Sequence, residues 1–185
     1  MKFKSLGIIY KLKKKYNWSL THCMCPTVFK LRNNKIRIFF GSRNNKNISS
    51  IGFVDLKYKK KKFEVIRQSN KPVLSQGLLG SFDDNGVLPS CVIKKNKLYY
   101  LFYIGWRPNV TTRYSLIAGL AQSKNLSVFK RVSKSPILKL NDNEPYQILT
   151  APTVIKKNKE YYMWYVSCNR WLNKDFPYYD IKFAT

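Results

Sequence analysis

The stretch PSCVIKKNKLYYLFY at residues 89–103 decides the fold, because a similar stretch stands on either side of it. The neighbouring stretches are PTVFKLRNNKIRIFF at 26–40 and PTVIKKNKEYYMWY at 152–165. Their leading prolines are 63 residues apart, and their central asparagines (34, 96 and 158) are 62 residues apart. Agreement over a dozen positions at a constant spacing indicates a structural repeat.

Each copy of the repeat has the pattern of a β-hairpin. A short apolar run follows the proline, a Lys/Asn turn comes next, and an aromatic-rich run follows the turn. Asparagine tolerates the turn conformation that other residues resist, and proline is accepted at the first residue of a strand. We therefore expect the asparagines in the turns, the prolines at the strand starts, and the aromatic strands buried on both faces.

The second half of the unit repeats as well. Residues 51–55, 118–122 and 179–184 correspond, and the runs 63–66 and 129–132 are each consistent with a fourth strand. Four strands in a unit of about 60 residues are typical of a propeller blade. The sequence predicts an all-β fold, a β-propeller of four-stranded antiparallel blades. The predicted units are 22–85, 86–148 and 149–185, with 1–21 as an N-terminal strand or extension of one partial domain.

The predicted ring is incomplete. A propeller needs roughly four to eight blades, and this chain supplies two complete units and most of a third. We expect a truncated or split product with an exposed sheet edge, or a fragment that needs a second chain to supply the missing blades.

The chain is strongly basic, with 35 Lys and Arg against nine Asp and Glu and a net charge of +26. Such a charge raises the question of nucleic acid or another polyanion. The lysines fall mostly on predicted turns, which favours a solvated surface, although the shortage of acids leaves an anionic partner open.

The compartment is predicted from cysteine use and from apolar runs. The four cysteines lack zinc-knuckle spacing, and we expect reduced, buried thiols, no metal and no cofactor. The N-terminal apolar run at 6–10 is too short for a signal peptide, and no run approaches the ~18 residues of a membrane span. These features favour a cytoplasmic protein.

Carboxylates stand in the loops that lead into two of the inner strands. These loops face the central funnel of a propeller, and they contain four of the nine acids: Asp83, Asp84, Asp142 and Glu144. Two carboxyl groups facing a cleft can divide the work of glycoside hydrolysis. Asp84 and Glu144 are the candidate catalytic pair, and Asp83 is a candidate for substrate binding. The alternative is that these are ordinary turn residues.

Further candidates for substrate binding lie beside the same strands. His22 is the only histidine and precedes Pro26, while Arg43 and Arg107 follow the aromatic strands and could bind an anionic group. Trp106 and Trp171 stand in equivalent loops, where a sugar could stack on either ring or the ring could serve packing alone.

These stretches resemble the five-bladed β-propeller glycosidase group, which includes invertase-like, levansucrase-like, arabinanase-like and mannoside-phosphorylase-like proteins. The matching residues include 6–10, His22 with Pro26, 36–40 with Arg43, 80–90, 103–106, 119–121, 144–145, 163–167 and 179–184. The resemblance is stronger to an uncharacterised branch associated with bacterial surface-polysaccharide loci, although Asn44 stands where that branch has an acid. It implies five blades, with acidic residues at the funnel ends of the inner strands.

Three functional hypotheses follow. The first is a glycosidase-like propeller fragment that acts on glycans as a hydrolase or phosphorylase. The second is a non-catalytic module that binds an anionic carbohydrate. The third, ranked last, is charge-driven binding of nucleic acid.

Overall fold

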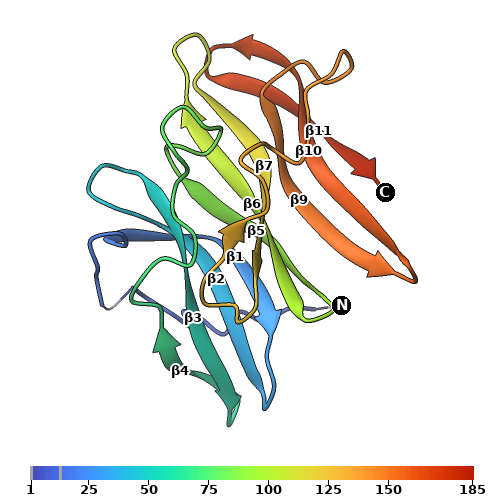
Figure 1. Ribbon diagram of the computed structural model, residues 1–185. Helices are drawn as coiled ribbons and strands as arrows, with labels where there is room; N and C mark the ends of the chain where they lie inside the picture. The colour runs from blue at the N-terminus through green and yellow to red at the C-terminus, as the bar shows by residue number, and fades with distance from the viewer. Residues whose placement is uncertain (1, 13) are drawn as a thin grey trace.

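The computed structural model describes residues 2–12 and 14–185, and in them every regular element is a strand (Figure 1). The first sheet contains β1 (Thr21–Lys30), β2 (Lys35–Arg43), β3 (Ser49–Lys59) and β4 (Lys62–Gln68). The next strands are β5 (Val87–Lys95), β6 (Leu98–Pro108), β7 (Tyr114–Ser123) and the short β8 (Lys130–Arg131). The last are β9 (Ile148–Lys157), β10 (Glu160–Asn173) and β11 (Phe176–Ala184).

The strands form three antiparallel units arranged side by side. In the first, β1, β2, β3 and β4 pair in chain order. In the second, β5, β6 and β7 pair in order and β8 pairs with β7, while in the third β9, β10 and β11 pair in order. Two parallel residue pairs between β7 and β9 join the second and third units. These units are three blades of a β-propeller, which confirms the predicted fold class; below they are called blades 1, 2 and 3.

The inner strands of neighbouring blades touch at equivalent positions of the repeat. The Thr27 hydroxyl on β1 donates to the carbonyl of Ser90 on β5 (3.3 Å), and the Ser90 hydroxyl donates to the carbonyl of Pro152 on β9 (2.9 Å). These contacts span 63 and 62 residues, so the spacing read from the sequence is the spacing between blades.

The predicted role of asparagine in the hairpin turns is confirmed. Asn34, Asn96 and Asn158 have φ angles of 55°, 54° and 57°, which lie in the left-handed region. Asparagine enters this region at lower cost than most residues with a Cβ atom. It therefore closes the same hairpin in each blade.

The prediction that each proline opens its strand is wrong. Pro26, Pro89 and Pro152 lie inside β1, β5 and β9, at register shifts in the pairing with the next strand. Pro26 and Pro152 have no partner in the register, so they lose no ladder hydrogen bond there, while Pro89 pairs with Tyr103 directly before the shift. In blades 1 and 3 the preceding residues, Cys25 and Ala151, have φ near 50°, which bends the strand at this point.

The main core lies between blades 1 and 2. Phe39 and Phe53 of blade 1 pack with Leu101 and Phe129 of blade 2, and all four side chains are buried. The rings of Phe39 and Phe129 meet edge to face at 5.7 Å. Burial of each such side chain stabilises the fold by about 1.5–3 kcal/mol, so this interface is a major source of stability.

The opposite face of blade 1 is covered by the N-terminal segment. Tyr10 and Leu12 pack against a second cluster that includes Phe40 and Val54, and the Tyr10 and Phe40 rings are 5.6 Å apart. Burial raises the pKa of Tyr10 to about 12, with smaller contributions from Cys23 and Tyr16. The segment therefore shields one face of blade 1 without joining its sheet.

Two expectations about burial are wrong. All four cysteines are free as predicted, but Cys23 and Cys25, in the mostly exposed first half of β1, are exposed, and Cys91 is only half-buried. The aromatic strands are covered on both faces in blades 1 and 2, whereas the outer face of blade 3 leaves Trp164, Ile181 and Phe183 exposed.

Candidate functional site

The loop that leads into β5 holds Asp83 as a buried structural carboxylate. Its Oδ2 accepts hydrogen bonds from the Tyr103 hydroxyl (3.0 Å) and from Nε of Arg131 (2.8 Å), and its Oδ1 accepts from Ser81 (2.9 Å). Only 1% of Asp83 is exposed. Burial, followed by the charge of Asp83, raises the pKa of Tyr103, so this hydroxyl stays protonated and donates. The contacts favour an anchor for the loop over a substrate ligand.

Asp84 lies beside Asp83 but has a different environment. It is half-buried, and its Oδ2 accepts a hydrogen bond from the backbone N–H of Gly80 (2.8 Å). Nη1 of Arg107 makes a long contact with the carbonyl of Gly80 (3.5 Å). In the described residues Asp84 forms no ion pair, so its carboxylate is the one at this loop that remains available to a ligand.

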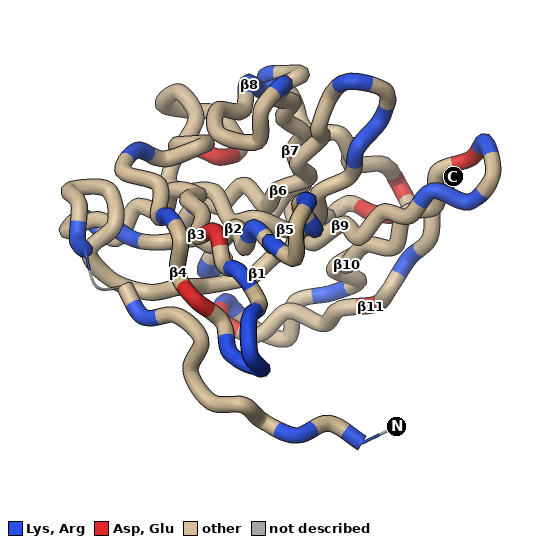
Figure 2. The backbone as a smooth tube through the Cα atoms, turned by 90° about the horizontal axis from the view of Figure 1, so that it is seen from below, with Lys and Arg blue, Asp and Glu red and all other residues tan. Residues whose placement is uncertain are grey.

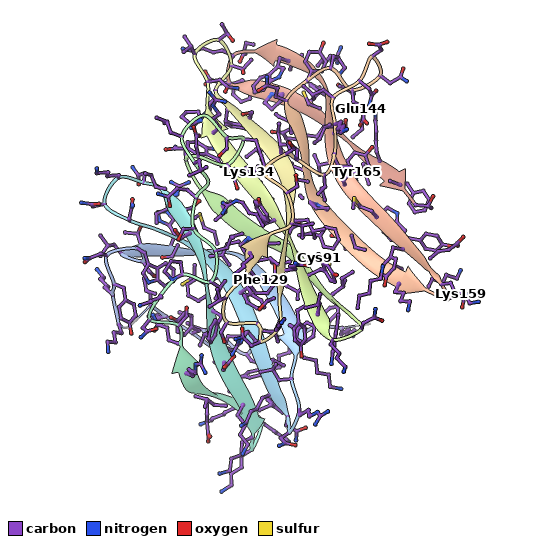
Figure 3. All side chains as sticks on the ribbon, viewed as in Figure 1. Cys91, Phe129, Lys134, Glu144, Lys159 and Tyr165 are labelled. Carbon is purple, nitrogen blue, oxygen red and sulfur yellow. The ribbon has the colours of Figure 1, made fainter. Side chains whose placement is uncertain are left out.

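Glu144, in the loop that leads into β9, repeats the arrangement of Asp83. It lies near Tyr165 in Figure 3, and the Tyr165 hydroxyl donates to its carboxylate at 3.2 Å. Tyr103 and Tyr165 occupy the same position of the repeat, opposite the prolines of their blades. Lys182 on β11 forms an ion pair with Oε1 at 3.2 Å, in place of the arginine that binds Asp83. The environment again resembles that of a structural anchor.

The surroundings of Glu144 set its protonation. Burial raises the pKa of the carboxyl group, but the polar groups that face it, which include the Tyr165 hydroxyl and the charged Lys182, outweigh burial. The pKa therefore lies below its usual value. A lowered pKa suits a carboxylate that stays ionised, as a nucleophile or a structural anion, and does not suit a general acid.

A groove of about 700 Å³ brings together Arg107 and Trp171, two of the predicted substrate-binding residues. It lies between the ends of β6 and β10 and also contains Tyr114, Tyr146 and Gln147. The rings of Tyr114 and Trp171 meet edge to face at 6.0 Å. Arg107 is the one charged residue among those that line the groove. Aromatic walls with a few polar groups are typical of ligand sites.

The other predicted residues do not join this groove. His22 is exposed, has a φ of 65° and pairs through Nδ1 with the Thr21 hydroxyl (2.8 Å). Arg43 ends β2, where its carbonyl accepts from Leu20. Trp106 is half-buried, and its backbone N–H donates to the carbonyl of Gly86 (2.9 Å). Asp84 and Glu144 share no hydrogen-bonded partner in the described residues, and their roles stay predictions.

Sequence reasoning missed several residues that shape these sites. Arg131 and Lys182 hold the two anchoring carboxylates from 48 and 38 residues away, and Tyr114 and Tyr146 line the groove. Of these, the tyrosine that meets each carboxylate could have been found, because it follows from the alignment of the repeats. The cations occupy different positions in the two blades, so no spacing rule reveals them.

Two properties of the described residues bear on the class of site. Residues 2–12 and 14–185 contain no group of three or more His, Cys, Asp or Glu side chains arranged to hold a metal ion. They also contain no helix with the length and apolar character that a membrane span requires.

Comparison with known proteins gives relatives by sequence and by structure. No family model matches the chain. Two proteins from strains of Mycobacterium tuberculosis, both named as uncharacterized, are 32% identical over 173 residues, which covers 92% of this chain and 56% of theirs. The chain thus spans about half the length of these curated relatives.

The solved structures decide the fold. A structure named as a glycoside hydrolase matches with a TM-score of 0.64 at 16% identity, covering 95% of this chain and 49% of the other. An exo-1,5-alpha-L-arabinanase from a bovine ruminal metagenomic library matches with a TM-score of 0.61 at 15% identity, covering 98% and 59%. The GH32 beta-fructofuranosidase of Bombyx mori matches with a TM-score of 0.59 at 13% identity, covering 87% and 33%.

The chain has the fold of the β-propeller glycosidases. This confirms the resemblance predicted from the repeat and from the loops around it. At these identities the comparison establishes the fold, and the chain covers only part of each of these three structures.

Proposed function

We propose that this chain belongs to a β-propeller protein that acts on glycans. We propose further that it binds the glycan in the groove between the ends of β6 and β10. The observation that carries the proposal is the composition of this groove. It combines the edge-to-face pair of Tyr114 and Trp171 with one arginine, Arg107. Sugars stack on such rings through their C–H faces, and a guanidinium group binds carboxylate or phosphate substituents.

The charge of the groove favours an anionic glycan. Arg107 has no acidic neighbour among the lining residues, and the whole chain carries a net charge of +26. Gln147 adds an amide group that can bind hydroxyls. A uronic acid or a phosphate-bearing sugar is therefore the substrate class that the groove fits best, and surface-polysaccharide metabolism is consistent with such a substrate.

We propose that turnover requires a complete ring of blades. This chain contributes Asp84 to that ring as one of the two catalytic carboxyl groups. Glycoside hydrolysis ordinarily needs two carboxyl groups on either side of the bond. Asp84 is available, whereas Asp83 and Glu144 are engaged by Arg131 and Lys182. We propose that further blades supply the second carboxyl group. Asp84→Asn should then abolish the activity of the complete ring, and unchanged sugar cleavage would remove Asp84 from the mechanism.

Binding to this chain alone can be measured by calorimetry against neutral and uronic-acid-containing oligosaccharides. We expect the acidic sugars to bind, Trp171→Ala to weaken binding about tenfold or more, and Arg107→Ala to weaken binding of acidic sugars only. Trp164→Ala is the matched control, because this tryptophan lies outside the groove. Equal effects of the two tryptophan variants would contradict the proposal.

A second candidate, binding of nucleic acid through charge alone, is favoured only by the number of basic residues. Figure 2 shows these residues spread over turns and loops on several sides of the molecule, not gathered on one surface. Charge-driven binding would fall steeply with salt and would not depend on Trp171. The same calorimetric series, repeated with single-stranded DNA at two salt concentrations, separates the two functions.

A further inference from the structure

The loop that leads into β5 borders the groove and also a second pocket. On the side of the groove, Nη1 of Arg107 contacts the carbonyl of Gly80 at 3.5 Å. Leu78 and Ser81 of the same loop line a pocket of about 430 Å³, below called the loop pocket. The Cα atoms of Leu78 and Gly80 lie at most about 7–8 Å apart, because two peptide units join them. One extended polymer can therefore reach both the groove and the loop pocket.

Arg131 gives the loop pocket a guanidinium group that is fixed before any ligand binds. Its Nε donates to Oδ2 of Asp83 (2.8 Å), and its Nη2 donates to the carbonyl of Ser75 (2.7 Å). The same group lies 5.7 Å from the centre of the Tyr103 ring. Among the residues that the structure describes, no acceptor contacts Nη1. A positioned donor with a free edge binds an anion without the cost of ordering a flexible side chain.

Lys134, labelled in Figure 3, gives the loop pocket a second cation. It forms no ion pair within residues 2–12 and 14–185. Asp83 is the one acidic residue that lines the pocket, and its carboxylate already accepts hydrogen bonds from Ser81, Tyr103 and Arg131. The capacity that is left in the pocket is therefore for donation by cations, and an oxyanion complements it.

We propose that the loop pocket binds a second anionic substituent of the glycan that occupies the groove. This inference rests on the proposed function and makes the substrate a chain with repeated negative charges. The volume of the pocket lies in the range of sites for small ligands. Leu79, between Leu78 and Gly80, is 99% exposed and offers an apolar contact to the sugars that cross the loop.

Calorimetry with galacturonate oligosaccharides of two lengths tests the loop pocket. A hexasaccharide, which can reach both sites, should bind about tenfold or more tighter than a disaccharide, because its second contact is intramolecular. Lys134→Ala should remove most of this gain, since a charge-assisted contact is lost. It should leave the Tm unchanged, because Lys134 has no ion-pair partner in the part of the chain that the structure describes. Lys139→Ala, at an exposed lysine outside the pocket, is the matched control and should keep the gain.

The outcomes separate this proposal from the proposed function. If Trp171→Ala weakens neither oligosaccharide while Lys134→Ala still weakens the longer one, the groove is not the glycan site but the loop pocket stands. Equal effects of the two lysine variants, or equal affinity for the two lengths, would overturn the loop pocket. Inorganic phosphate, titrated alone, tests the other source of an oxyanion. Phosphate binding that depends on Lys134 and that the hexasaccharide does not displace would assign the pocket to free phosphate and would also overturn the proposal.

Discussion

The two blade interfaces of this chain are built from the same repeat but differ in completeness. Between blades 1 and 2, Phe39 is fully covered, and the segment with Leu126 and Phe129 fills the remaining space. Between blades 2 and 3, the equivalent Phe102 is 7% exposed and lines a hollow. On the outer face of blade 3 the equivalent Trp164 is 38% exposed. Equivalent positions thus pass from core to surface along the chain.

This difference teaches that an aromatic strand does not determine its own burial. The pattern of the sequence is the same in the three blades, but each face is buried only where a neighbouring blade and its crossing segment cover it. The difference also predicts that stability is concentrated in blades 1 and 2, since that is where the apolar area is removed from water.

The largest contrast is expected for truncation of equivalent aromatic residues. Phe39→Ala should lower the free energy of unfolding by about 3–5 kcal/mol, because it leaves a cavity in a packed core. Trp164→Ala should cost about 1 kcal/mol, because that side chain is partly exposed and packs mainly on Phe183 (5.3 Å between rings). Urea unfolding measures both, and equal losses would contradict the difference between the interfaces.

The buried ion pair of Arg37 and Asp55 gives a second test of the interface between blades 1 and 2. Arg37 donates to both oxygens of Asp55 (2.7 Å each) and to the carbonyl of Leu126 (2.8 Å), and it stacks on Phe53 at 3.5 Å. Arg37→Met should cost about 3 kcal/mol, because it leaves a buried carboxylate unpaired.

Two control variants accompany this measurement of unfolding. Arg67→Met, at an exposed arginine near the same ring, should change stability little. Arg37→Met combined with Asp55→Leu should recover much of the loss, since no charge is then left buried. A double variant as unstable as the single one would show that the contact with Leu126 matters more than the charge.

A smaller effect, dependent on pH, is expected at Glu144. Its pKa in the folded chain lies below the unfolded value, because its hydrogen bonds outweigh burial. Its contribution to stability is therefore present above the unfolded pKa of about 4.3 and is lost as the pH falls through the lower folded pKa. The Tm advantage of the parent chain over Glu144→Gln should shrink between about pH 6 and pH 3. A constant difference across this range would contradict the assigned role.

The smallest change in stability is expected on the outer face of blade 3. Ile181 is 78% exposed, so Ile181→Lys should alter the free energy of unfolding by less than about 0.5 kcal/mol. It should reduce any self-association, because exposed apolar faces and strand edges promote it. Sedimentation velocity reports the association, and a large loss of stability would show that this face is covered.

The repeat made the fold predictable, and the sites were predictable only in part. Constant spacing placed the hairpins, and the tolerance of asparagine for positive φ placed their turns. The positions of the prolines were predicted wrongly, because a register shift inside a strand tolerates a residue without an N–H donor as well as a strand start does. Arg107 and Trp171 were found as loop residues, whereas the partners of Asp83 and Glu144 depend on side chains that meet across strands.

Hydrogen–deuterium exchange along the unmodified chain tests the central comparison most directly. Local opening costs least where few apolar contacts hold a strand and its edge is exposed. We predict the slowest exchange in β2, β3 and β6, slower exchange in β7 than in β11, and fast exchange in the part of β11 that flanks the hollow. Protection of β11 equal to that of β3 would contradict the account, since it would show that the third blade is as complete as the first.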